Sequence, residues 1–252
     1  MAMGAPMPTN MATARMITAT ATVTAMPMIT AMTTPTITPI DTGLLTLAQW
    51  LGPGFPIGAF AFSHGLETAI ASGWVHDGPS LHAWLGDLLH HGSGRSDASW
   101  VWAAIAATDA GALAQLHAEA RARMPAAERL REGDMQGAAF ARLVRQVWGL
   151  DLPDMLLPLA VGRAVALSGL PQDQAVALYL QGFVANLVSA AVRLVPLGQT
   201  TGQQVQARLA PACAQIAAET RGLGPDDIYS NSFLADVAAM RHETQEPRLF
   251  QS

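Results

Sequence analysis

An apolar stretch from Ala175 to Val195 constrains the fold of this chain more than any other feature. It is long enough to cross a membrane as a helix. Polar residues recur within it, however, and Arg193 ends it without flanking cations. Pro171 and Asp173 precede it, and both residue types favour the first turn of a helix. We therefore predict a helix that is buried on all sides at the centre of a helical bundle.

The remaining residues after position 41 also follow helical patterns. One helix is expected from Phe60 to Ser72, where Gly73 ends it. Another begins after the start signal Asp77-Gly78-Pro79-Ser80, and its apolar residues recur on one face. Nowhere in this part do β-branched and polar residues alternate as they do in a strand. The sequence therefore predicts an all-α, single-domain bundle of roughly 8–10 helices.

The first forty residues differ in composition from the rest of the chain. Residues 1–40 are rich in Met, Ala, Thr and Pro, and Arg15 is their only charge. We expect either a disordered extension or a start site placed too far upstream. The all-helical domain is expected to cover residues 41–252.

Composition excludes several classes of function. Only 13% of the residues are charged, which favours burial of apolar surface against a partner. The net charge of −5 argues against nucleic-acid binding. The chain contains no Lys, so it cannot supply a P-loop lysine or a Schiff base. Its only cysteine, Cys213, excludes an internal disulfide and is expected to be buried in a protein of a reducing, cytoplasmic compartment.

No constellation of side chains predicts catalysis. If Ser63 and His64 lie on a helix, they point about 100° apart and cannot act as nucleophile and base. His64 and Glu67 have the spacing of a structural contact on a helix. His90 and His91 are neighbours, a poor spacing for metal binding. The charge-dense residues 119–134 are interpreted as a solvated helix junction.

Three segments remain unexplained by helix packing alone. The first, Gly54 to Glu67, combines glycines with aromatic residues. The second, Ala190 to Thr200, contains Arg193 at the end of an apolar helix, where a charge needs a partner. The third, Met240 to Ser252, carries an apolar Leu-Phe pair among charges, as a docking segment does.

Together these three segments resemble the UreF urease accessory family. Phe55 to Glu67 matches the pattern Phe-Pro-x-Gly-x-(aromatic)-x-x-Ser-His-Gly-Leu-Glu, and Ala191 to Gln199 matches Ala-x-Arg-Leu-x-Pro-Leu-Gly-Gln. His242 to Ser252 matches His-Glu-x-Gln-x-x-Arg-Leu-Phe-x-Ser. Gln251 departs from the pattern, because many members carry a basic residue there. The resemblance extends from about residue 44 to the end of the chain.

The resemblance implies an all-α accessory protein without enzymatic activity. Members of the family dimerise and bind UreD (also called UreH), and that complex recruits the GTPase UreG. The assembly activates apo-urease with nickel, and UreF-like proteins gate the GTPase and form part of a nickel tunnel. The resemblance thus implies no resident cofactor, only nickel in transit.

The resemblance also implies roles for particular residues. Leu249 and Phe250 would anchor the tail on UreD. Arg193 would hold the end of its helix and the turn that leads to Gln199, while His64 and Glu67 would line or support a polar interior path. The residues expected to bind a partner are Arg241, His242, Glu243, Arg248, Leu249, Phe250 and Ser252.

Two other readings remain open. A helical metal-dependent hydrolase acting alone would hold a metal and turn over substrate as the purified chain. A small membrane protein would use residues 175–195 as its span and would depend on detergent.

Overall fold

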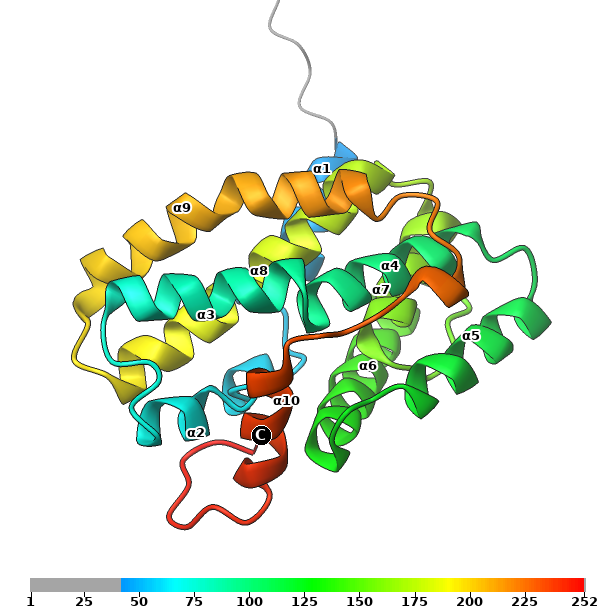
Figure 1. The fold of residues 1–252 in the computed structure, drawn as a ribbon. Coiled ribbons are helices and arrows are strands. Elements are labelled where there is room, and N and C mark those ends of the chain that lie inside the picture. The colour runs from blue at the N-terminus through cyan, green and yellow to red at the C-terminus, as the bar shows by residue number, and fades with distance from the viewer. Residues whose placement is uncertain (1–41, 252) are drawn as a thin grey trace, which may run out of the picture. The chain divides into compact units, whose positions relative to one another are not determined.

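All regular secondary structure in residues 42–251, the part that the computed structural model describes, is helical (Figure 1). This confirms the all-α prediction for these residues, while the extension expected over residues 1–40 lies outside them. The elements are α1 (Thr42–Leu51), η1 (Ala59–Ala61), α2 (Leu66–Ala71), α3 (Gly78–His90), α4 (Ser93–Ala106), α5 (Ala110–Ala122), α6 (Ala127–Trp148), α7 (Leu157–Ser168), α8 (Gln172–Leu194), α9 (Gly198–Glu219), η2 (Pro225–Asp227) and α10 (Phe233–His242). Here η marks a short 3-10 helix.

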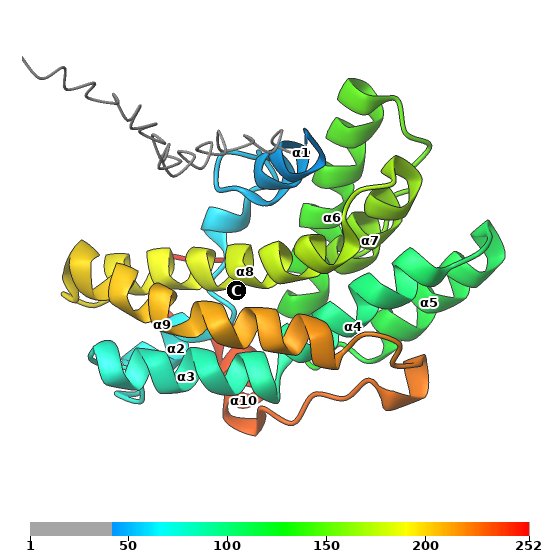
Figure 2. The same ribbon diagram turned by 90° about the horizontal axis from the view of Figure 1, so that it is seen from above.

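Helix α8 lies at the centre of this arrangement. It packs along α9 and also contacts α1, α2, α3, α4 and α7. Figure 2 shows α8, α9 and α3 running side by side, with α4 continuing beyond the end of α3. Helix α7 packs between α4 and α6, and α10 contacts α2 and α6. The C-terminal helix is therefore held by two elements that lie far before it in the sequence.

The central position predicted for this helix is confirmed, but its burial on all sides is not. From Ala175 onwards only Ser189 and Arg193 of α8 are exposed, yet many of its residues are half-buried, and one face lines a cavity. By length and composition α8 could span a membrane, and half of its most apolar window is buried within the fold. A core helix of this kind passes the same test. The helices packed against α8 account for its buried apolar residues.

Local signals set the ends of several helices as expected. The side chain of Asp77 accepts a hydrogen bond from the backbone N–H of Ser80 at 2.8 Å, which caps the start of α3. Gly169 ends α7 in the left-handed conformation, with φ 61°. Cys213 is buried as predicted, and burial raises the pKa of its thiol to about 11.

The helix expected from Phe60 to Ser72 is wrong in its first half. Only Leu66–Ala71 forms α2, because His64 and Gly65 both have positive φ, 61° and 76°. Two successive left-handed residues cannot continue a right-handed helix. At Gly65 a side chain is also excluded, since a Cβ would lie 2.7 Å from the backbone nitrogen of Ala239 in α10. The sharp turn therefore brings α2 into close contact with α10.

Candidate functional site

The three segments that the sequence singled out meet at one place on the fold. Arg193 donates a hydrogen bond to the carbonyl oxygen of Phe60 at 3.0 Å, and its guanidinium lies 4.6 Å from the centre of the Phe250 ring. The backbone N–H of Gln251 donates to the carbonyl oxygen of Ala61 at 2.8 Å. The end of the chain is thus fixed between η1 and the end of α8.

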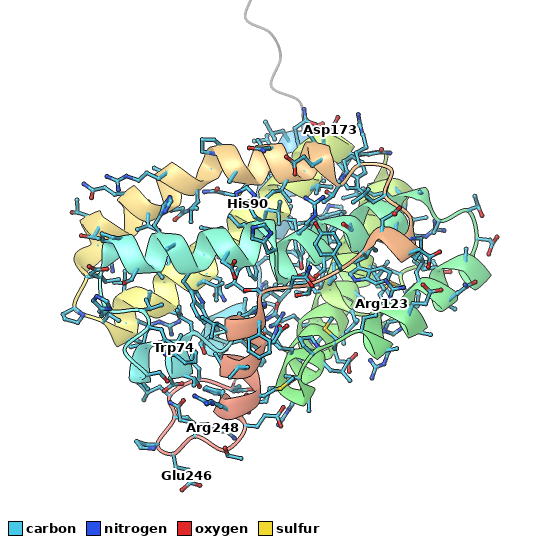
Figure 3. The ribbon with its side chains drawn as sticks, viewed as in Figure 1. Trp74, His90, Arg123, Asp173, Glu246 and Arg248 are labelled. Carbon is cyan, nitrogen blue, oxygen red and sulfur yellow. The ribbon has the colours of Figure 1, made fainter. Side chains whose placement is uncertain are left out.

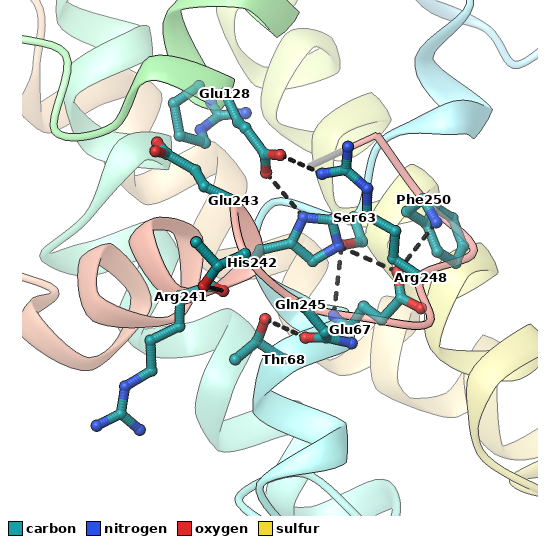
Figure 4. A network of polar contacts seen from close by, with 12 residues as sticks. Ser63, Glu67, Thr68, Glu128, Arg241, His242, Glu243, Gln245, Arg248 and Phe250 are labelled. Carbon is teal, nitrogen blue, oxygen red and sulfur yellow. Dashed lines mark hydrogen bonds and ion pairs between the residues drawn. The ribbon is translucent and has the colours of Figure 1, made fainter.

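Glu67 holds the C-terminal tail, residues 243–251, through the tail's backbone (Figure 4). Its Oε1 accepts a hydrogen bond from the N–H of Leu249 at 2.7 Å, and its Oε2 accepts one from the N–H of Phe250 at 3.0 Å. The same Oε2 lies 3.1 Å from Nε2 of His242. Hydrogen bonds to an ionised carboxylate are about twice as strong as neutral ones. One buried side chain therefore positions both α10 and the tail.

His242 links this carboxylate to a second one. Its side chain is fully buried, and its Nδ1 lies 2.7 Å from Oε2 of Glu128 at the start of α6. Arg248 donates to the other oxygen of Glu128 at 2.6 Å. A carboxylate only accepts hydrogen bonds, so both contacts of the His242 ring are hydrogen bonds only when both ring nitrogens carry protons. The arrangement therefore fits an imidazolium between Glu67 and Glu128.

Further contacts tie the tail to the same two helices. The hydroxyl of Thr68 in α2 donates to the side-chain oxygen of Gln245 at 2.6 Å. The carboxylate of Glu243 accepts from the N–H of Ala127, the first residue of α6, at 3.0 Å. A negative group at this position satisfies a free N–H and complements the helix dipole.

The two proposed anchors differ in exposure. Leu249 is 80% exposed, whereas Phe250 is only 6% exposed because it packs under Arg193. The tail therefore orders against its own chain, and in this conformation Leu249 is available to a partner while Phe250 is not. Docking on UreD remains a prediction, and Ser252 lies outside the described residues.

Arg241 occupies the outer side of the same region. Its guanidinium lies 5.9 Å from the centre of the Trp74 ring, at cation–π distance. Figure 3 shows Trp74 at the same end of the molecule as Glu246 and Arg248. The tail, α10 and the loop between α2 and α3 thus present a mixed aromatic and charged surface there.

Arg193 has partners at the end of α8, as its position in the sequence required. It is exposed, and it donates hydrogen bonds to the carbonyl oxygens of Ser189 and Phe60. Gln199 is exposed in the first turn of α9. That Arg193 holds the turn that leads to Gln199 stays a prediction.

His64 and Glu67 have different partners. The left-handed turn at His64 removes the helical spacing on which their expected contact depended. Nε2 of His64 lies 2.9 Å from the hydroxyl of Ser93, and its Nδ1 lies 3.4 Å from Glu132. His64 therefore belongs to a second buried polar cluster, centred on α6.

This second cluster contradicts the interpretation of the charge-dense segment as a solvated junction. Arg129 and Glu132 form an ion pair and are 7% and 6% exposed, and Gln136 donates to Glu132 at 3.0 Å. Helical spacing places these three residues on the same face of α6 as Phe140 and Val144, which are in the core. That periodicity is the signal that could have identified them.

Asp97 and Tyr179 complete the cluster and were missed at the sequence level. The Tyr179 hydroxyl donates to Asp97 at 2.8 Å in the interior. Burial raises the pKa of Asp97 to about 6, although the nearby Arg129 opposes this shift. Burial, aided by the charge of Arg129, lowers the pKa of His64 to about 4. At neutral pH His64 is therefore uncharged and Asp97 is mainly ionised.

Two cavities adjoin this cluster. Their volumes are about 430 and 640 Å³. The residues that line both of them are His64, Asp97, Met124 and Arg129. The polar cluster is therefore a common wall of the two cavities. Within residues 42–251, no group of three or more His, Cys, Asp or Glu side chains is arranged to hold a metal ion.

We expect Asp97 and His64 to give the stability of the fold opposite dependences on pH. Because the pKa of Asp97 is raised from 3.8 to about 6, its burial costs stability as pH rises through that window. Because the pKa of His64 is lowered from 6.5 to about 4, its burial costs stability as pH falls through its own window. As pH rises from 4 to 7, the free energy of unfolding of Asp97→Asn should increase by up to about 3 kcal/mol relative to that of the wild type. Over the same range, the free energy of unfolding of His64→Asn should decrease by a similar amount relative to that of the wild type.

Urea unfolding of the wild type and the two variants across this pH range measures both effects. Asparagine suits both positions, since it keeps an acceptor for Tyr179 and tolerates the left-handed backbone at position 64. If the stability differences of the two variants from the wild type change with pH in the same direction, the assignment is contradicted.

The comparisons with known proteins agree with one another. The family model named UreF matches residues 75–210. The urease accessory protein UreF of Cereibacter sphaeroides is 52% identical over 213 residues, which cover 84% of this chain and all of the relative. The proteins of the same name from Roseobacter denitrificans and Azorhizobium caulinodans are 48% and 45% identical, covering 82% of this chain and 93% and 95% of the relatives. The relatives are thus named as accessory proteins rather than as enzymes.

Proposed function

Because this chain belongs to the UreF family of urease accessory proteins, which support urease maturation, we propose that it is a scaffold linking UreD to the GTPase UreG. In this role it assists delivery of nickel to apo-urease in the cytoplasm, as a homodimer. The observation that carries the proposal is the ordered tail, which leaves Leu249 80% exposed at the end of a rigidly held segment. Ordering before binding lowers the entropic cost of association.

The composition supports a division of labour with the GTPase. A P-loop needs a lysine to bind the nucleotide phosphates, and this sequence contains none. Nucleotide hydrolysis is therefore assigned to UreG, and this chain gates that activity through contact.

The second polar cluster supports a transient path for nickel rather than a resident cofactor site. An uncharged imidazole and a carboxylate are both ligands for Ni²⁺. His64 and Asp97 supply these groups in the wall that the two cavities share. Two ligands without a complete coordination set suit a metal that passes through.

Replacing Leu249 with serine is expected to weaken UreD binding without affecting the fold. The side chain is exposed, and the backbone N–H that bonds to Glu67 is unchanged by the substitution. Loss of an apolar side chain that becomes buried in the complex should raise Kd roughly tenfold or more, which corresponds to about 1.4 kcal/mol. Co-expression with UreD and UreG, followed by affinity pull-down and titration of the purified proteins, measures the effect.

Val147→Ser is the matched control, because Val147 is 64% exposed but lies in the last turn of α6, away from the tail in sequence and in contacts. It should bind UreD as the wild type does. Equal affinities of the two variants would refute the tail as the docking surface, and failure of the wild type to bind either protein would refute the scaffold.

A further inference from the structure

The buried charges around His242 balance only when its ring is protonated. The side chains of Glu67 and Glu128 are 7% and 12% exposed, and each is within hydrogen-bond distance of one nitrogen of the fully buried ring. Arg248 neutralises one of the two carboxylates. Without the second ring proton, a ring lone pair would face a carboxylate oxygen, and an unpaired negative charge would remain buried.

We propose that Glu67, His242 and Glu128 form a protonation-dependent latch that holds residues 248–251 in the conformation that a partner protein binds. We call these three residues the tail latch. Only the last step, binding of the partner protein, rests on the proposed function. Closure of the tail latch is a property of the isolated chain.

The contacts of Glu67 explain why a proton on His242 controls the tail. Oε2 of Glu67 is shared between Nε2 of His242 and the N–H of Phe250, and Oε1 accepts from Leu249. The imidazolium therefore stabilises the carboxylate in the position that binds both amides. When the ring is neutral, the carboxylates lose a cationic partner, and their burial then costs more than their exposure to water. The amides of the tail lose their acceptor when the carboxylate of Glu67 moves towards water.

The remaining charged groups near the tail do not replace the ring proton. In α10, Arg241 points to Trp74, and in α8 Arg193 lies over Phe250. In the tail, Glu243 is engaged with the N–H of Ala127, and Arg248 already pairs with Glu128. Among the side chains in contact with Glu67 and Glu128, His242 at the end of α10 is the imidazole, and the other charged one is the guanidinium of Arg248.

Amide hydrogen exchange of the full chain tests the tail latch. The exchange of a peptide covering residues 248–251 would be measured by mass spectrometry at about pH 6 and about pH 9, below and above the titration of an ordinary imidazole. After correction for the intrinsic rate, we expect protection of this peptide to fall at least tenfold at the higher pH. Peptides from α9 serve as the internal control and should keep their protection.

A variant separates the positioning role from a merely structural one. His242→Gln keeps one donor but cannot titrate, so its tail should be less protected than that of the wild type and should not respond to pH. If His242→Gln fails to fold, Glu128→Gln is tested instead. Between the two pH values, the protection of its tail should change by at most a third of the wild-type change. Wild-type protection that is independent of pH, or a variant with the full pH response, would overturn the proposal.

Binding of UreD at the same two pH values separates this inference from the proposed function. Tighter binding at the lower pH, lost in the non-titrating variant, supports coupling of the latch to docking. A tail latch that responds to pH with no binding of UreD at either value would refute the docking role and leave the latch itself intact.

Discussion

Replacing Gly137 with alanine is expected to destabilise the protein by about 3 kcal/mol or more. Gly137 lies in the middle of α6, where the chain leading into α7 crosses it. A Cβ at this position would lie 1.8 Å from the carbonyl oxygen of Met155 and 2.8 Å from the backbone nitrogen of Leu157. Backbone atoms cannot move aside as a flexible side chain can, so α6 and α7 must separate.

Gly86→Ala is the matched control for this substitution. Gly86 also lies inside a helix, α3, but a Cβ there would meet no atom within 4 Å. Alanine should therefore stabilise the protein by up to about 1 kcal/mol through helix propensity. Thermal and urea unfolding should move in opposite directions for the two variants. A Gly137→Ala protein as stable as the wild type would show that α6 and α7 do not approach so closely.

Replacing Arg129 with methionine should cost roughly 3–5 kcal/mol, because it removes the cationic partner of a buried carboxylate, that of Glu132. Both side chains are below 10% exposed, and Glu132 also contacts Gln136 and the uncharged His64. The effect includes more than the lost ion pair, since Arg129 also opposes the raised pKa of Asp97.

Two further variants define the origin of that cost. Arg221→Met breaks an ion pair with Asp173 in which both side chains are more than half exposed, and it should cost less than about 1 kcal/mol. Combining Arg129→Met with Glu132→Leu removes both charges and should restore most of the lost stability. The coupling energy from urea unfolding of the full cycle measures this. If the loss of stability in the double variant equals the sum of the losses in the two single variants, the assignment of a buried ion pair is contradicted.

The helices were predictable wherever short-range signals determine them. Asp77 with Ser80, Gly169, and the apolar stretch of α8 each act within a few residues of their own position. Capping and periodicity depend only on such neighbours, and for that reason the sequence indicates them correctly.

The errors arose where contacts with distant elements determine the backbone or the burial. His64 adopts a left-handed conformation because α2 must meet α10 at Gly65, a constraint that lies far along the chain. Arg129 and Glu132 are charged, and charge density alone favours solvent. Their burial follows from α6 packing on α7, which the local composition does not reveal.

The candidate site was predictable in its residues but not in its pairing. The sequence singled out Glu67, Arg193 and His242, and the structure brings their segments together. Glu128 was not singled out, because it is one of many charges in its segment. Which carboxylate meets which end of His242 depends on how α2, α6 and α10 converge, and this is a property of the tertiary fold.

The order of protein synthesis gives the Glu67 contacts a further consequence. Glu67 accepts hydrogen bonds from amides 182 and 183 positions later in the chain, so the carboxylate is synthesised long before its two donors. These contacts cannot form until translation has passed Phe250. A nascent chain that has not reached this residue therefore lacks the ordered tail.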